Sequence, residues 1–211
     1  MLIVALTGGI ASGKSIIAGV LDNLGCYVYY ADKISHELMT PKKQAWKKIV
    51  DHFGDKILNK DKTINRAKLG SIVYTDAKKR QFLNELIHPL VFKKRKETIN
   101  NLKKEGRYKI FVSEAALTIE AGLADFYDKI IMVYCQKEVQ IKRLMQRDHI
   151  NQKEALKKIK SQMEPEEKLK FADYIIDSSG LIESTVEQTE QVFRNLMMDY
   201  ELKCKSASSK Q

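Results

Sequence analysis

The sequence predicts an α/β fold: a parallel five-stranded sheet with helices on both faces and a helical insertion. Three observations support this prediction. Short apolar runs alternate with helical segments, a glycine-rich octet follows the first run, and a long stretch of helical pattern separates the second run from the third. Because the runs are continuously apolar, they fit strands buried on both faces, as in parallel sheets. We expect strands at Leu2–Leu6, Tyr27–Tyr30, Ile110–Val112, Ile130–Tyr134 and Tyr174–Ile176.

The octet from Gly8 to Ser15 matches GxxxxGK[ST] at every position and lies between the first strand and a predicted helix. Its glycines let backbone N–H groups turn toward phosphate oxygens, and the helix adds its positive N-terminal end. A chance glycine turn is the alternative, but strand, octet and helix occur in register. The context therefore predicts a fold of the P-loop NTPase type, in which Lys14 reaches the β- and γ-phosphates of ATP and the Ser15 hydroxyl binds Mg²⁺. The expected nucleotide-binding residues are Gly8, Gly9, Ala11, Ser12, Gly13, Lys14, Ser15 and Ile16.

Composition and charge are those of a folded, soluble protein. The 211 residues are 44% apolar and 30% charged, and no run approaches the ~18 apolar residues of a membrane span. The chain starts without a signal-peptide pattern, and its three widely spaced cysteines suggest neither a zinc site nor a disulfide framework, so we expect a cytoplasmic protein. The net charge of +10 is compatible with nucleic acid, anionic surfaces or small polyanions, but most lysines fall on outer helix faces, which favours solvated side chains.

Charged residues follow the next three strands, at the edge where open α/β sheets bind ligands. Asp32 follows the second strand, where it is either a ligand-side acid or a helix cap. Glu114 ends the third strand. Arg143 and Arg147 are four residues apart on the helix after the fourth strand, so they could grip one anion together or form an exposed basic face. The string Asn59–Lys62 has the wrong order for a guanine signature, which disfavours a GTPase.

Helical segments fill the remainder of the chain. The insertion after the second strand has apolar stripes that we interpret as core, and we expect a turn at Asn59–Asn65 and an interruption at Pro89, the first residue of the next helix. The polar segment from Lys137 to Lys170 should pack loosely, as a mobile cover or an ordinary surface hairpin. A last helix at about Ile182–Leu202 should be followed by a frayed polar tail, Lys203–Gln211.

Over nearly its whole length the chain resembles the dephospho-coenzyme A kinases. The resemblance rests on strings that occur in the family's order: Val4–Ser15, Ala31–Asp32, His88–Leu90, Glu120–Leu123, Gln140–Asp148, Gln162, and Ala172–Asp177 with Gly180. It implies transfer of the ATP γ-phosphate to the 3′-hydroxyl of dephospho-coenzyme A, with Mg²⁺. It also implies three parts: a nucleotide-binding core (residues 1–31, 108–136 and 171–211), a helical substrate domain (32–107) and a lid (137–170).

The resemblance also implies roles for particular residues. Asp32 resembles the base that accepts the hydroxyl proton, and Arg143 and Arg147 resemble lid arginines that contact ATP phosphates, so these three and Lys14 are the expected catalytic residues. The loop Asp177–Gly180 resembles one near adenine. On the substrate side the expected residues are Asp32, His88, Glu114, Leu117 and Glu120. The implied partner is dephospho-coenzyme A alone, with no nucleic acid or membrane, and the chain is expected to be a monomer or weak homo-oligomer.

Three positions depart from the family's usual pattern. Tyr30 stands where the family often has an acid, which leaves Asp32 as the only acid there, and Glu114 to Thr118 keeps an acid but lacks the family's proline. Ser178 stands where asparagine is frequent. Two rival functions remain at this point: a nucleoside monophosphate kinase with the same architecture, and a basic nucleic-acid-binding regulator that uses ATP as a switch.

Overall fold

The computed structural model describes residues 1–208, which divide into two compact units. The first contains Met1–Tyr30 and the described part of Ile99–Gln211, and the second is Ala31–Thr98. The boundary between them after Thr98 lies inside one long helix, α5 (Ala77–Glu105). The two units are described separately below.

The first unit is built on a five-stranded parallel sheet, as the sequence predicted. Its order is β2-β3-β1-β4-β5, so β1 is the central strand and has neighbours on both sides. All seven residues of β1 are buried, which explains its continuous apolarity. The octet therefore leaves the sheet from its middle, at the carboxyl edge. The strands are β1 (Leu2–Gly8), β2 (Tyr27–Tyr30), β3 (Ile110–Glu114), β4 (Lys129–Tyr134) and β5 (Tyr174–Asp177).

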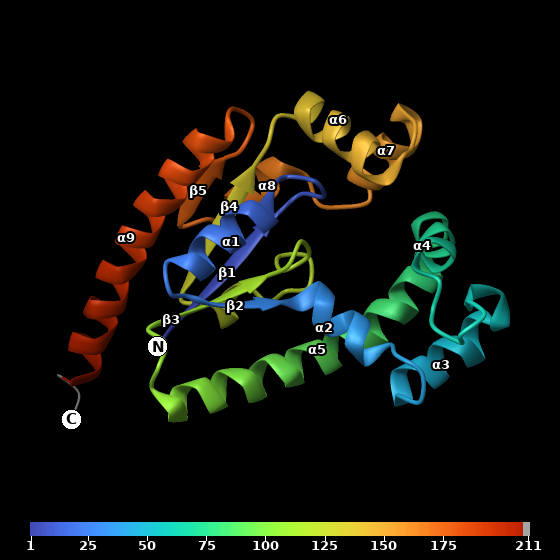
Figure 1. Cartoon of the computed structure of the whole chain (residues 1–211), viewed down its shortest axis with the longest axis horizontal. Coiled ribbons are helices and arrows are strands. Elements are labelled where there is room, and N and C mark those ends of the chain that lie inside the picture. The colour runs from blue at the N-terminus through green and yellow to red at the C-terminus, as the bar shows by residue number, and fades with distance from the viewer. Residues whose placement is uncertain (209–211) are drawn as a thin grey trace. The chain divides into compact units, whose positions relative to one another are not determined.

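Two helices, α1 (Lys14–Asn23) and α9 (Ile182–Ser208), pack on this sheet and on each other (Figure 1). Alternate residues of β1, including Val4 and Leu6, share one hydrophobic core with Ile17 of α1 and Leu196 of α9, and all four side chains are fully buried. Burying an apolar side chain of this size stabilises a fold by roughly 1.5–3 kcal/mol. This core anchors the helix that begins at the octet.

The segment after β4 forms three short helices, α6 (Lys137–Asp148), α7 (Gln152–Ile159) and α8 (Pro165–Leu169). The start of α7 has a capping box, in which the Asn151 side chain accepts from Glu154 N and the Glu154 carboxylate accepts from Asn151 N. The expectation that this polar segment packs loosely is wrong for α8, because Lys168 is only 1% exposed. Its ammonium group finds polar partners inside the first unit, as described below.

The second unit is helical. The predicted turn lies between the 3₁₀ turn η1 (Asp55–Ile57) and the helix α4 (Arg66–Thr75). Asn59 N donates to Thr63 O at 2.9 Å, and Asn65 caps α4 by accepting from Lys68 N at 3.0 Å. Its elements are α2 (Ala31–Leu38), α3 (Gln44–Phe53), the 3₁₀ turn η1 (Asp55–Ile57), α4 (Arg66–Thr75) and most of α5. The first unit has a second 3₁₀ turn, η2 (Ala124–Phe126).

Two boundary predictions were wrong. The helix α5 continues through Pro89, although proline lacks the backbone donor of a helix interior, because Ile87 and Val91 on either side are buried and hold both halves in place. The last helix runs to Ser208, six residues into the tail that was expected to fray; residues 209–211 lie outside the described part. The polar composition of residues 203–208 therefore did not mark the end of the helix.

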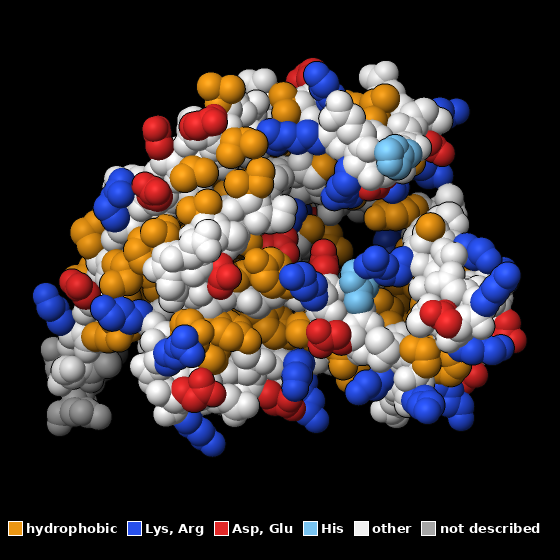
Figure 2. All heavy atoms as spheres, in the orientation of Figure 1, with side chains coloured by type: hydrophobic (Ala, Val, Ile, Leu, Met, Phe, Trp, Pro, Cys, Tyr) orange, Lys and Arg blue, Asp and Glu red, His pale blue; other side chains and the backbone are white. Residues whose placement is uncertain are grey.

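On the face shown in Figure 2, positively charged side chains are exposed. In Figure 2, Lys and Arg side chains are scattered over the visible face and mixed with Asp and Glu. No helix within residues 1–208 is both long enough and apolar enough to span a membrane.

Candidate active site

The octet between β1 and α1 has the backbone conformation that its glycines predict. Gly13 has a φ of 86°, and Gly8 has a φ of 154°. A Cβ on Gly8 would lie 2.6 Å from Val133 O, which is closer than real Cβ atoms approach, so only glycine fits at this end of β1, beside β4. Ala11 also has a positive φ, 58°, which is uncommon for a residue with a side chain. The loop is thus a tightly specified turn at the sheet edge.

Lys14 lies at the start of α1 and folds back over this loop. Its Nζ donates to Gly8 O at 3.0 Å and to Gly9 O at 2.9 Å, and the residue is buried. The next residue, Ser15, is exposed in the first turn of α1. The positive end of the helix, the lysine and the loop amides together make this region suited to an anion such as a triphosphate.

Ser15 also offers a suitable oxygen for Mg²⁺, which uses few protein ligands and keeps water and phosphate oxygens in its shell. Among the described residues, no group of three or more His, Cys, Asp or Glu side chains is arranged to hold a metal ion by itself. The donor chemistry therefore fits a cation that arrives with a nucleotide rather than a site built from carboxylates.

Arg143 lies next to the octet, whereas Arg147 has a different neighbour. Arg143 Nη2 donates to Ser178 O at 2.8 Å, and its Nη1 is 3.7 Å from where a Cβ of Gly13 would be. Arg147 is exposed and forms an ion pair with Asp148, with Nε 2.8 Å from Oδ1. The two guanidinium groups therefore share a helix but hold different partners in this structure, and their joint action on one phosphate remains a prediction.

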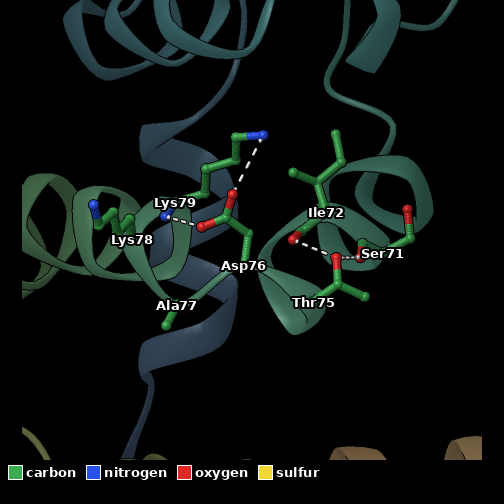
Figure 3. Close-up of a pocket in the computed structure, with 7 residues that line it drawn as sticks. All are labelled: Ser71, Ile72, Thr75, Asp76, Ala77, Lys78 and Lys79. Carbon is green, nitrogen blue, oxygen red and sulfur yellow. Dashed lines mark hydrogen bonds and ion pairs between the residues drawn. The ribbon is translucent and has the colours of Figure 1, made fainter.

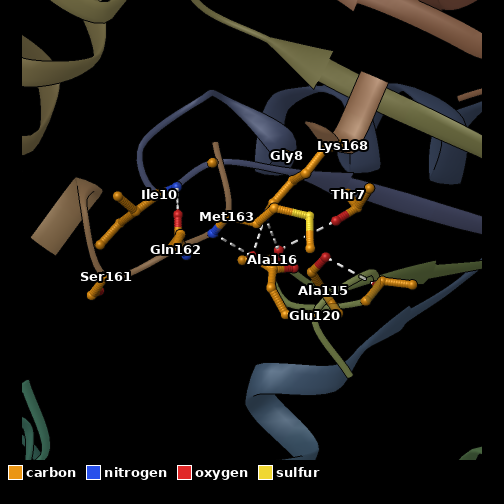
Figure 4. A network of polar contacts seen from close by, with 12 residues as sticks. Thr7, Gly8, Ile10, Ala115, Ala116, Glu120, Ser161, Gln162, Met163 and Lys168 are labelled. Atoms are coloured by element: carbon orange, nitrogen blue, oxygen red, sulfur yellow. Dashed lines mark hydrogen bonds and ion pairs between the residues drawn. The ribbon is translucent and has the colours of Figure 1, made fainter. Parts of the chain in front are cut away.

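The end of β3 and the loop that follows it carry three of the expected substrate-side residues, Glu114, Leu117 and Glu120. Glu114 ends β3 and pairs in register with Leu6 of β1. Glu120 Oε1 lies 2.6 Å from Lys168 Nζ and accepts a hydrogen bond from Met163 N at 3.2 Å (Figure 4). Glu120 thus ties the loop after β3 to the region of α8, and Leu117 lies in the same loop, half-buried.

The same network reaches the octet. Gln162 Oε1 accepts from Ile10 N at 2.7 Å (Figure 4), and Gln140 Nε2 donates to Ile10 O at 2.7 Å. Sequence reasoning quoted both glutamines as family matches but assigned them no role, and it did not single out Lys168 as functional. No local signal distinguishes Lys168 from a surface lysine, since its partners lie in a distant part of the sequence.

The remaining expected residues, Asp32 and His88, belong to the second unit. Asp32 is exposed and lies within the first turn of α2, which begins at Ala31. It is therefore not the residue that precedes the helix, as a simple N-cap would be, although its charge still suits the positive helix end. His88 is half-buried in α5, and burial together with the positive charge of Arg95 lowers its pKa below the usual 6.5.

Comparison with known proteins gives this site its context. A family model described as dephospho-CoA kinase matches residues 2–184. The chain belongs to the dephospho-CoA kinase family. The dephospho-CoA kinase of Carboxydothermus hydrogenoformans is 45% identical over 186 residues, which cover 88% of this chain and 90% of the relative. That of Syntrophus aciditrophicus is 38% identical over 209 residues, which cover 99% and 89%. The solved dephospho-CoA kinase from Campylobacter jejuni is 32% identical and has a TM-score of 0.66, covering 92% of this chain and 96% of that one.

Two departures from the pattern of dephospho-CoA kinases can be examined in the structure. Tyr30 lies opposite Glu114 in the register of β2 and β3, and burial, followed by the negative charges of Asp22 and Glu114, raises its pKa. It therefore stays neutral and does not replace the acid that the family often has there. Ser178 donates from its hydroxyl to Ser12 O at 2.6 Å, so the serine holds the loop after β5 against the octet.

A hollow in the second unit is lined by none of the expected site residues. It has a volume of about 760 Å³ at the junction of α4 and α5 (Figure 3). Its polar groups bond to one another: Thr75 Oγ1 donates to Ser71 O at 3.0 Å, and Asp76 accepts from Lys79 N at 3.1 Å. We assign no function to it. The lining residues are Ser71, Ile72, Thr75, Asp76, Ala77, Lys78 and Lys79.

Proposed function

We propose that this chain transfers the γ-phosphate of ATP to the 3′-hydroxyl of dephospho-coenzyme A, giving coenzyme A and ADP. The observation that carries the proposal is the combination of a complete P-loop on the central strand with a dephospho-CoA kinase family match over residues 2–184. The P-loop explains binding of a nucleoside triphosphate, and the family match supports the identity of the acceptor.

The protein's main task in this reaction is to position two anionic substrates and to neutralise charge. The ribose hydroxyl oxygen forms a bond to the γ-phosphorus while the bond from that phosphorus to the β,γ-bridging oxygen breaks, and ADP leaves. Lys14 and the loop amides bind the triphosphate, and Arg143 and Arg147 contribute positive charge. Asp32 accepts the hydroxyl proton. Ser15 would hold Mg²⁺, which when bound would offset negative charge on the phosphate groups.

The same proposal includes the substrate side and the setting. His88, Glu114, Leu117 and Glu120 contact dephospho-coenzyme A, and the loop Asp177–Gly180 lies near adenine. We place the protein in the cytoplasm, as a monomer or weak homo-oligomer that binds no nucleic acid. Free thiols support a reducing compartment: Cys26, Cys135 and Cys204 form no disulfide.

A coupled ADP-release assay with dephospho-coenzyme A, followed by mass spectrometry of the product, tests this function. We expect ADP release that depends on the acceptor, and a product that gains one phosphoryl group. A panel of nucleoside monophosphates serves as the competing set of acceptors, and a reaction without acceptor measures ATP hydrolysis. Preferential phosphorylation of a nucleoside monophosphate would replace the proposal with the rival kinase, and ATP-dependent, salt-sensitive nucleic-acid binding without transfer would favour the regulator.

A further inference from the structure

One residue of the P-loop, Ile10, is held from both sides by glutamine side chains. Gln162 Oε1 accepts from Ile10 N at 2.7 Å, and Gln140 Nε2 donates to Ile10 O, also at 2.7 Å. The backbone partners fix the orientation of both amides, because an N–H must face an oxygen and a carbonyl must face an N–H. The backbone orientation at Ile10 is thereby set by two contacts from outside the loop.

The surroundings of these contacts are built for them. Gln140 is only 4% exposed, so its amide has been moved out of water to reach Ile10. A Cβ on Gly9 would lie 2.5 Å from Gln140 Nε2, so the missing side chain of Gly9 makes the approach possible. A buried amide without a partner is costly, which makes this a contact the fold depends on rather than a chance encounter.

Ile10 directly precedes Ala11, whose backbone conformation is strained. Ala11 has a φ of 58°, and non-glycine residues in this region cost of order 1–3 kcal/mol and persist where surrounding contacts over-determine them. The two bonds to Ile10 supply such contacts on the N-terminal side of Ala11. Without them, the strained φ of Ala11 would have fewer contacts to maintain it.

The two glutamines come from different elements. Gln140 lies in α6, whereas Gln162 lies between α7 and α8, next to Met163, whose N donates to Glu120 Oε1 (Figure 4). Glu120 in turn pairs with the buried Lys168. The side chain of Gln162 thus binds the P-loop, and the backbone amide of Met163 binds the loop after β3.

We propose that Gln140 and Gln162 are positioning residues for phosphoryl transfer. They hold Ile10 so that the P-loop is preformed for the triphosphate, and Gln162 makes that conformation depend on the seating of the segment between α7 and α8. The inference rests on the proposed kinase activity, but nucleotide binding alone can test it, so failure of the acceptor assignment would leave it standing.

Methionine substitutions test the two contacts individually, because methionine keeps the length of glutamine and removes its hydrogen bonds. Gln140→Met and Gln162→Met should each weaken MgADP binding in calorimetry by about 3- to 10-fold, the equivalent of one hydrogen bond. The double variant should lose less than the product of the single effects, because both contacts act on Ile10. Gln146→Met on α6 and Gln152→Met on α7, both at exposed positions, are the matched controls and should bind MgADP like wild type.

Glutamate substitutions separate hydrogen bonding from packing, because both variants place the same added charge beside Ile10 of the P-loop. Gln162→Glu keeps an acceptor facing Ile10 N, whereas Gln140→Glu places an acceptor against Ile10 O. We expect Gln140→Glu to bind MgADP at least several-fold more weakly than Gln162→Glu, and Gln162→Glu to recover part of the kcat lost in Gln162→Met. The proposal fails if both methionine variants keep wild-type nucleotide affinity and kcat while only their melting temperatures fall, or if the two glutamate variants bind alike.

Discussion

Replacing the buried Lys168 with methionine should destabilise the fold far more than its sequence context suggests. Its Nζ lies 2.6 Å from Glu120 Oε1 and donates to Ala116 O at 2.9 Å, with the lysine side chain 1% exposed. Breaking a buried ion pair costs ~3–5 kcal/mol, but the Glu120 side chain is 21% exposed and keeps some contact with water, so we expect about 2–3 kcal/mol. For a chain of this length that is a fall in melting temperature of roughly 5–10 °C.

Urea and thermal unfolding of Lys168→Met, compared with Lys170→Met, would measure this loss. Lys170 also forms an ion pair, with Glu167 at 2.7 Å, but both side chains are more than half exposed, so its loss should change the free energy of unfolding by less than about 1 kcal/mol. Adding Glu120→Met to Lys168→Met should recover part of the stability, because no charge is then left without its partner. Equal destabilisation by the two lysine variants would refute the argument from burial.

Four further predictions concern the candidate site. Lys14→Ala should abolish turnover with little change in melting temperature, because the lysine stabilises phosphate charge rather than the core; residual activity near wild type would contradict this role. Arg143→Ala and Arg147→Ala should each lower kcat, and the effects should not add in the double variant. Arg143→Ala should lower kcat by ~10²-fold if the Arg143 guanidinium stabilises the charge of the transferred phosphoryl group directly. Asp32→Asn should lower kcat by ~10²–10⁴-fold while ATP affinity in a titration stays unchanged, whereas a purely structural acid would leave kcat intact. Because the pKa of His88 is lowered in the folded chain, the unfolded chain binds a proton at His88 at higher pH. The free energy of unfolding should therefore decrease as pH falls below 6.5. His88→Asn should make this decrease smaller in urea titrations at several pH values.

The strands and the P-loop could be predicted because their signals are local. β1 is buried along its whole length and its composition reflects this, and the octet carries its own backbone requirements in Gly8 and Gly13. The order of strands in the sheet was not predicted, because apolar runs identify strands but not their neighbours. The helix boundary at Pro89 was predicted wrongly because the local signal was outweighed by tertiary packing. Proline favours the start of a helix, but burial of the residues around Pro89 keeps the helix continuous.

The least predictable part of the site is its polar support. Arg143 and Arg147 share a helix face by spacing, yet their side chains reach Ser178 and Asp148 respectively, and spacing alone does not determine such end points. Likewise, a lysine in a run of charged residues is usually solvated, and the burial of Lys168 becomes evident only when α8 and the loop after β3 are brought together.

Several polar residues after β4 therefore form specific hydrogen bonds that composition alone does not indicate. A surface helix needs such residues only for solubility, but here an amide from α6, another from the segment before α8 and an ammonium group in α8 each satisfy a backbone group or carboxylate near the P-loop. A buried polar group without a hydrogen-bond partner costs free energy. Each of these contacts therefore favours the arrangement in which all three are formed. Apolar replacements of the same volume could preserve packing in this segment, but they would remove the directional bonds that fix the P-loop backbone. Hydrogen-bonding geometry, rather than hydrophobic burial alone, thus links this segment to the nucleotide site.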